Sequence, residues 1–95
     1  MEVELDKIPC LPGSLEVINA LKIRSSLHDA NKKASKLGVL QDKSEILFDP
    51  QTSGGLVFAV EKSRALEMIS SLNQRGYNHA AIIGESIPES CLRVK

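Results

Sequence analysis

The stretch from Asp49 to Gly55 carries more chemical groups than a simple turn requires. Its sequence is Asp-Pro-Gln-Thr-Ser-Gly-Gly, so a carboxylate, an amide and two hydroxyl groups precede a glycine pair. Glycines allow positive φ and let a ligand approach the backbone closely, and a corner of this kind presents N–H groups that bind anions. The stretch therefore predicts a loop near a phosphate or another substrate anion. Its candidate site residues are Asp49, Gln51, Thr52, Ser53, Gly54 and Gly55.

The same residues also fit a purely structural role. A tight connection between two strands, with an Asx turn at Asp49, would use the proline, the hydroxyls and the glycines in the same order. The loop is not a Walker loop, because no G-K-[ST] sequence follows it and no helix is expected to begin there. The residues alone leave both interpretations open.

The other reactive side chains do not suggest a second motif. Cys10 and Cys91 lie at opposite ends of the chain, without the C-x-x-C spacing or the four soft ligands typical of a zinc site. His28 follows a helix-cap candidate and is expected to face solvent. We therefore predict no metal site in this chain.

Hydrophobic periodicity predicts the elements that position the loop. Apolar runs bounded by turn residues predict strands at 3–5, 44–48, 56–60, 80–83 and 91–94. Apolar residues at helical spacing predict helices at 15–21, 27–37 and 65–72. The continuous run at 56–60 is typical of a strand covered on both faces, and it opens a β-α-β unit that ends at 83. The predicted fold class is α/β or α+β, a small mixed sheet of about four to five strands with helices packed on it.

Composition narrows the class of protein. The chain has 95 residues, of which 42% are hydrophobic, and twelve basic residues balance twelve acidic ones. A chain without excess positive charge is not expected to bind nucleic acid or an anionic membrane. Its apolar runs are far shorter than the roughly 20 residues of a membrane span, and its amino terminus has no signal pattern. We expect a single cytoplasmic domain.

The loop also carries a family resemblance. Residues 47–56, LFDPQTSGGL, are very similar to the L-[FC]-D-P-Q-T-S-G-G-L signature of selenophosphate synthetases, the selenide, water dikinases. Residues 8–16 (IPCLPGSLE) and 81–85 (AIIGE) resemble two further segments of that family, and residues 91–95 resemble its final strand. The stretch 25–31 departs from the common glycine-containing version, which leaves the subfamily open. Asn31 aligns with an asparagine of the family and is a further site candidate.

The resemblance implies that residues 1–95 are an incomplete carboxy-terminal domain, similar to that of aminoimidazole ribonucleotide synthetase. The whole enzyme would convert selenide, ATP and water to selenophosphate, AMP and phosphate with Mg²⁺. The family's catalytic Cys or selenocysteine, its lysine and its magnesium-binding aspartates belong to segments outside this chain, and Cys10 stands at a position that is usually apolar. The chain alone is therefore expected to hold no catalytic residue, to bind no ATP or Mg²⁺, and to be inactive.

The expected partner is the amino-terminal catalytic domain, and a homodimer is the other association considered. Two rival interpretations remain. The chain could be a stand-alone α/β binding or regulatory module, or the carboxy-terminal domain of a purine-pathway synthetase or thiamine-phosphate kinase of the same superfamily. The Asp-Pro-Gln-Thr-Ser string favours the selenophosphate synthetases over those relatives.

Overall fold

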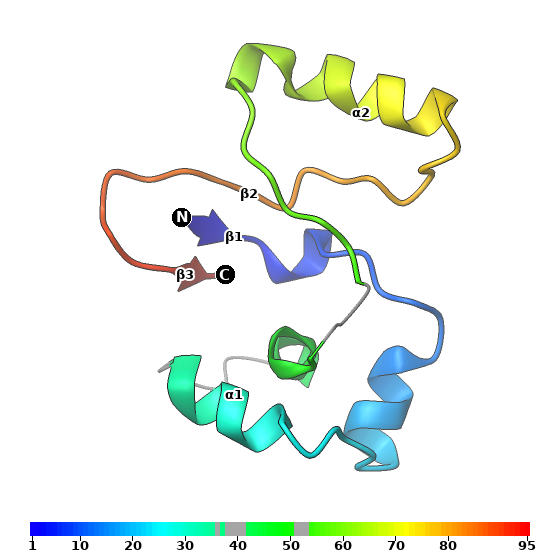
Figure 1. The fold of residues 1–95 in the computed structure, drawn as a ribbon, viewed down its shortest axis with the longest axis vertical. Helices are drawn as coiled ribbons and strands as arrows, with labels where there is room; N and C mark the ends of the chain where they lie inside the picture. The colour runs from blue at the N-terminus through cyan, green and yellow to red at the C-terminus, as the bar shows by residue number, and fades with distance from the viewer. Residues whose placement is uncertain (36, 38–41, 51–53) are drawn as a thin grey trace. The chain divides into compact units, whose positions relative to one another are not determined.

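The computed structural model describes residues 1–35, 37, 42–50 and 54–95 (Figure 1). Two compact units divide the chain. The sheet unit consists of Met1–Pro9 together with Leu56–Lys95, and the helical unit consists of Cys10–Gly55. Each unit is described by itself.

The sheet unit is built around a short central strand. Its strands are β1 (Glu2–Val3), β2 (Gly84–Glu85) and β3 (Arg93–Val94), in the order β2-β1-β3. β1 pairs antiparallel with β2 and parallel with β3, so the sheet is mixed. Two further backbone bonds extend the pairing, since the N–H of Glu4 donates to the carbonyl of Ile83 and that of Leu5 to the carbonyl of Lys95, both at 2.8 Å. The strand expected at 91–94 is confirmed in shortened form as β3, whereas of the strand expected at 3–5 only Val3 belongs to β1 and Leu5 begins η1.

The sheet unit also contains three helical segments. They are η1 (Leu5–Lys7), η4 (Lys62–Arg64) and α2 (Ala65–Gln74). α2 ends at Gly76, which takes a φ of +94°, and the N–H of Tyr77 donates to the carbonyl of Leu72 at 3.0 Å. A glycine in the left-handed region satisfies the last carbonyls of a helix without steric cost. The helix predicted at 65–72 and its glycine stop are confirmed.

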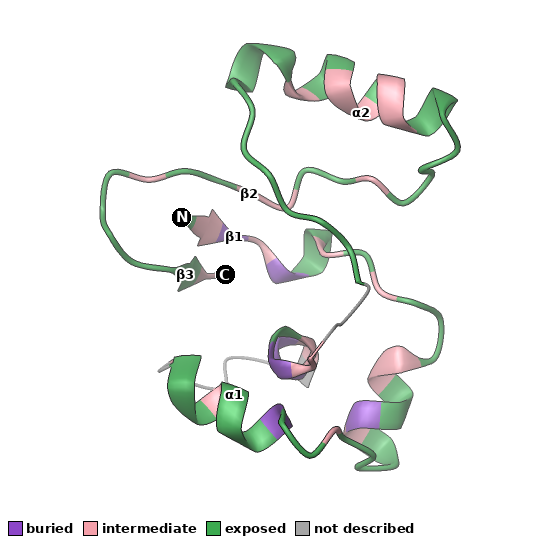
Figure 2. Cartoon of the chain, viewed as in Figure 1, coloured by how far each residue is buried: buried purple, intermediate pink, exposed green. Residues whose placement is uncertain are grey.

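The helical unit consists of the short π-helix η2 (Glu16–Ala20), α1 (His28–Ser35) and the 3₁₀-helix η3 (Asp42–Phe48). η2 and α1 confirm the helices predicted near 15–21 and 27–37. Among the described residues of this unit, buried side chains, purple in Figure 2, come from each of these helices. They are Ile18, His28, Ser44, Glu45 and Phe48.

The strand predicted at 44–48 is wrong, because these residues belong to η3. Glu45 and Phe48 are three positions apart and both are buried. A 3₁₀-helix places residues i and i+3 on the same side, whereas a strand places them on opposite faces. The contacts that both residues make with α1 therefore require a helix and override the strand propensity of Ile46, Leu47 and Phe48.

The strands predicted at 56–60 and 80–83 are also not formed, so the β-α-β unit is absent and the described residues contain three strands instead of four or five. Only the end of the second run meets the sheet, through the carbonyl of Ile83. Residues 56–60 are exposed along their whole length. A strand needs neighbours to pair with, and no partner for this run lies in the described part of the chain.

None of the helices in the described ranges has the length and apolar character that crossing a bilayer requires.

We predict that Gly84→Ala disrupts the pairing of β1 with β2. A Cβ at this position would overlap the carbonyl oxygen of Glu2 and lie 2.9 Å from the Cα of Val3. The expected loss is about 1–3 kcal/mol in the free energy of unfolding, the range for overpacked sites. Urea unfolding of the 95-residue chain measures it. Gly55→Ala is the matched control, because its added methyl meets open space. Equal losses in both variants, or none in Gly84→Ala, would contradict the register.

Candidate functional site

The structure brings two of the predicted site residues to the same place. Asn31 lies on α1, and its Nδ2 donates a hydrogen bond to the carbonyl oxygen of Phe48 at 3.0 Å. Asp49 follows directly, and its N–H donates to the carbonyl of Ile46 at 3.3 Å. The beginning of the predicted loop is therefore attached both to α1 and to the last turn of η3.

The rest of the predicted loop divides into two parts. Gln51, Thr52 and Ser53 lie outside the described residues. Gly54 and Gly55 are exposed. Gly55 does not take a positive φ, and a Cβ there would have no neighbour within 4 Å. Gly55 is thus not required by the fold of this chain, and close approach of a ligand remains a reason for a glycine at this position.

The buried carboxylate of Glu45 attaches η3 to basic side chains of the helical unit. Glu45 is only 5% exposed, and three basic side chains surround its carboxylate. Lys32 Nζ lies 2.7 Å from Oε1, while Arg24 Nη2 and His28 Nε2 lie 3.2 Å and 3.4 Å from Oε2. The hydrogen bond from Lys32 lowers the pKa of Glu45 below its ordinary value, against the opposing effect of burial. Glu45 is therefore held as a carboxylate in the folded protein.

His28 was expected to face solvent, and this is wrong, since it is 1% exposed. Its Nε2 lies 3.1 Å from the carbonyl oxygen of Glu45. A carbonyl only accepts, so Nε2 carries the proton and donates. The imidazole edge also packs against the ring of Phe48, with centroids 5.8 Å apart and planes at 85°. The side chain replaces lost solvation with one backbone hydrogen bond and one aromatic contact.

One face of α1 makes all these contacts. His28, Asn31 and Lys32 are spaced i, i+3 and i+4, which places them together on a helix. Lys32 bonds Glu45 and also lies over the Phe48 ring, 5.7 Å from its centroid. This face of α1 therefore holds both Glu45 and Phe48, and the loop begins one residue later. In the sequence, the spacing of His28, Asn31 and Lys32 already places three polar side chains on one helix face. This signal could have predicted that the face contacts another element.

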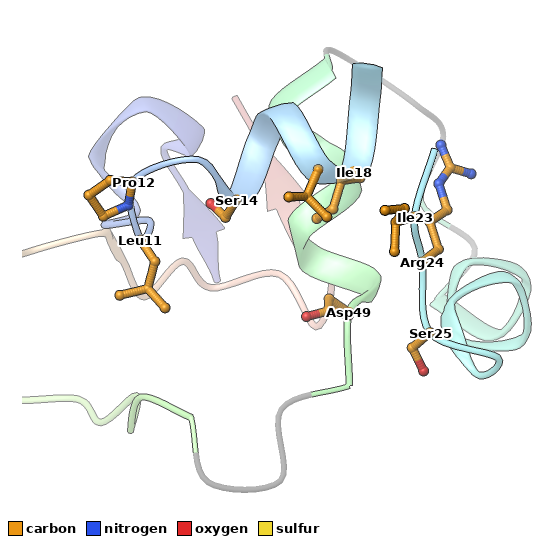
Figure 3. A pocket seen from close by; sticks show the side chains of 9 residues that line it. Leu11, Pro12, Ser14, Ile18, Ile23, Arg24, Ser25 and Asp49 are labelled. Atoms are coloured by element: carbon orange, nitrogen blue, oxygen red, sulfur yellow. The ribbon is translucent and has the colours of Figure 1, made fainter. Parts of the chain in front are cut away.

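An open hollow of about 480 Å³ lies on the helical unit beside Asp49 (Figure 3). Leu11 and Pro12 lie on one side, Ile23, Arg24 and Ser25 lie on the other, and Asp49 stands between them. Apolar side chains with a few polar groups are typical of small-molecule sites. Arg24, which lines the hollow, is also paired with Glu45. Its lining residues are Leu11, Pro12, Ser14, Val17, Ile18, Ile23, Arg24, Ser25 and Asp49.

The described side chains do not fit a magnesium site. In residues 1–35, 37, 42–50 and 54–95, no three His, Cys, Asp or Glu side chains gather closely enough to hold a metal ion. Glu45 is already neutralised by Lys32 and Arg24, and Asp49 is the acidic side chain that lines the hollow. Mg²⁺ in proteins is bound through carboxylates, water and substrate phosphates. Asp49 alone could contribute one ligand.

The chain is similar to bacterial proteins named selenide, water dikinase. It is 30% identical over 94 residues to that of Clostridioides difficile (strain 630), which covers 94% of this chain and 27% of the relative. It is 32% identical over 95 residues to that of Shewanella sp. (strain MR-4), covering 98% of this chain and 27% of the relative. For Caldanaerobacter subterraneus subsp. tengcongensis the identity is 34% over 89 residues, or 88% of this chain and 26% of the relative.

The chain thus spans about a quarter of the length of the curated relatives it matches. Neither a protein-family model nor a solved structure matches it.

We predict that Glu45→Gln destabilises the chain by about 1–2 kcal/mol at about pH 7, because Lys32 and Arg24 lose their counter-charge. Since the pKa of Glu45 is lowered in the folded state, its contribution is fully present above the ordinary value of 4.5. It is lost as the pH falls through the lowered folded-state value. Urea unfolding at a series of pH values should therefore show the two proteins converging in acid.

Glu89→Gln is the control for this prediction. Glu89 forms an exposed pair with Arg93 at 3.1 Å, and such pairs contribute little. The role of Glu45 would be contradicted if the difference in unfolding free energy between Glu45→Gln and the unchanged chain stayed constant down to about pH 3. An equal loss of stability in Glu89→Gln would contradict it as well.

Proposed function

Because the chain is homologous to the selenide, water dikinases over nearly its whole length, we propose that it is the carboxy-terminal part of such an enzyme. Two observations support this proposal. The LFDPQTSGGL segment at 47–56 matches the family's signature, and the chain corresponds to about a quarter of its relatives. The whole enzyme would form selenophosphate, AMP and phosphate from selenide, ATP and water.

In this proposal the rest of the enzyme supplies the nucleophile, the nucleotide site and most of the magnesium ligands. Phosphoryl transfer depends on metal ions and donors that neutralise charge on the transferred group. The described residues place one acidic side chain, Asp49, beside the hollow and no cluster of metal ligands. In this proposal Asp49 contributes to a reaction site whose other groups come from the rest of the enzyme.

The loop from Asp49 to Gly55 is the part of this chain that we assign to the reaction site. The observation that carries the assignment is the hydrogen bond from Asn31 to the carbonyl of Phe48, which fixes the residue just before the loop. A loop with a fixed starting point can hold N–H groups and hydroxyls in constant positions. Positioning of this kind supplies a large share of catalysis in phosphoryl transfer. The loop would orient a phosphate or the selenium-containing intermediate.

Gly55→Ala in the whole enzyme tests the assignment. The methyl group meets open space in the chain, so stability should change by less than about 1 kcal/mol. If a ligand approaches the backbone here, turnover should nevertheless fall by about tenfold or more. Melting temperature and turnover are measured on the same preparation. If turnover of Gly55→Ala is unchanged, the loop has only a structural role.

Thr52→Val provides a second, independent variant. It removes one hydroxyl from the loop and should lower turnover while the melting temperature stays the same. Ser63→Ala is the control, because Ser63 is exposed in η4, outside the loop. If Thr52→Val leaves turnover intact at both saturating and limiting ATP, Thr52 has no functional role.

We also predict that the 95-residue chain alone releases no AMP from ATP in the presence of selenide. The reason is that it offers no metal cluster among its described residues and lacks the family's catalytic segments. The measurement is AMP formation above a buffer blank, with the whole enzyme as the positive control. Selenide-dependent AMP formation by the purified chain would contradict its assignment as an inactive part. A whole enzyme without this activity would contradict the proposed reaction.

A further inference from the structure

Lys32 of α1 contacts two side chains of η3 at once. Its Nζ lies 2.7 Å from Oε1 of Glu45 and 5.7 Å from the centroid of the Phe48 ring. The first distance is that of a charge-assisted hydrogen bond, and the second is within the range of a cation–π contact. One ammonium group therefore joins the carboxylate and the aromatic ring that η3 buries in the helical unit.

Phe48 is the residue through which this contact reaches the loop. It is 2% exposed, it is the last residue of η3, and Asp49 follows it directly. Asn31, which precedes Lys32 on α1, donates from Nδ2 to the carbonyl oxygen of Phe48 at 3.0 Å. Consecutive residues of α1 thus hold the backbone and the ring of the same residue. Two contacts at different points of Phe48 restrict the position of the backbone at the start of the loop more than one contact does.

The negative charge of Glu45 does not by itself require Lys32. Arg24 Nη2 lies 3.2 Å from Oε2 of Glu45, so a cation remains beside the carboxylate when the ammonium of Lys32 is removed. The two cations differ in their second contact, because Lys32 lies over the Phe48 ring whereas Arg24 lines the hollow. Lys32 and Arg24 therefore share the neutralisation of Glu45, and Lys32 adds the contact with Phe48.

We infer that Lys32 is a positioning residue for the proposed reaction. Through Glu45 and Phe48 it fixes where the loop from Asp49 to Gly55 begins. The inference rests on the proposed function, because that function assigns the loop to the reaction site. Removal of the ammonium should leave α1 and η3 folded, since Arg24 still pairs with Glu45, but the start of the loop should vary in position. A displacement of about 1 Å can lower a reaction rate about a hundredfold.

Lys32→Met in the whole enzyme is the first test. Methionine keeps an unbranched side chain on α1 and removes the ammonium. We expect kcat to fall by about tenfold or more while KM for ATP changes by less than about twofold, because the loss concerns alignment and not nucleotide binding. Lys32→Arg should restore most of the turnover, since a guanidinium also bonds a carboxylate and stacks on an aromatic ring. A residue needed only for folding would lower the amount of folded enzyme and not the turnover of each folded molecule.

Lys33→Met is the matched control. Lys33 is the next residue of α1 and is exposed, so this variant removes the same charge from the same helix outside the contact with η3. It should keep the turnover of the unchanged enzyme. Unchanged kcat in Lys32→Met, an equal loss in Lys33→Met, or a Lys32→Arg variant as slow as Lys32→Met would overturn the inference.

A double-mutant cycle with Gly55→Ala shows whether Lys32 acts through the loop. Gly55→Ala changes the other end of the loop and is expected to lower turnover by itself. If Lys32 acts by positioning the loop, the two losses should not multiply, and the double variant should be no more than about threefold slower than the slower single variant. Losses that multiply would mean that Lys32 affects turnover by a route outside the loop, and they would overturn the inference.

Amide hydrogen exchange in the 95-residue chain separates this inference from the proposed function. The N–H of Asp49 donates to the carbonyl of Ile46, so its exchange rate reports on the end of η3. Lys32→Met should speed this exchange by about fivefold or more, and Lys33→Met should leave it unchanged. Faster exchange in Lys32→Met, together with a whole enzyme that forms no AMP from selenide and ATP, keeps the attachment of the loop by Lys32 and contradicts the proposed function. Unchanged exchange in Lys32→Met, together with an active whole enzyme, keeps the function and contradicts this inference.

Discussion

The buried carboxylate of Glu45 is the constraint on which the helical unit depends. A carboxylate in this environment is costly unless charge and hydrogen bonds compensate for lost water. Lys32, Arg24 and His28 provide that compensation, and two of them come from a single face of α1. The requirement to bring these groups to one point sets the rotation of η3 relative to α1. That rotation also brings Phe48 against the imidazole of His28.

Placement of the loop follows from this packing. The last residue of η3 is Phe48, whose carbonyl accepts from Asn31, so the same helix face that neutralises Glu45 also determines where Asp49 begins. A polar anchor suits this task because its geometry is directional, whereas apolar contacts alone permit sliding. The hollow beside Asp49 shares Arg24 with the cluster around Glu45. The ion pairs of Glu45 therefore also determine the position of one side chain that lines the hollow.

Sequence reasoning succeeded where the signal was local. α2 and its stop at Gly76 followed from apolar spacing and one glycine. It failed at 44–48, where contacts of Glu45 and Phe48 with α1 outweigh strand propensity. His28 was missed for the same reason, because no local pattern announces that a histidine will be buried against a residue seventeen positions away. For Gln51, Thr52 and Ser53 the functional expectation stays a prediction.

The failure at 56–60 has a different physical origin. Its pattern of apolar residues on both faces is a valid strand signal, but a strand exists only when another strand satisfies its backbone. The local signal and the observed exposure disagree because the pairing partner is not among the described residues of this chain. The same reasoning explains why the described residues form a sheet of three two-residue strands, since β1 pairs with β2 and β3 while the apolar run pairs with no described segment. A local pattern thus predicts where a strand can form, and the neighbours that the chain brings to it decide whether it does.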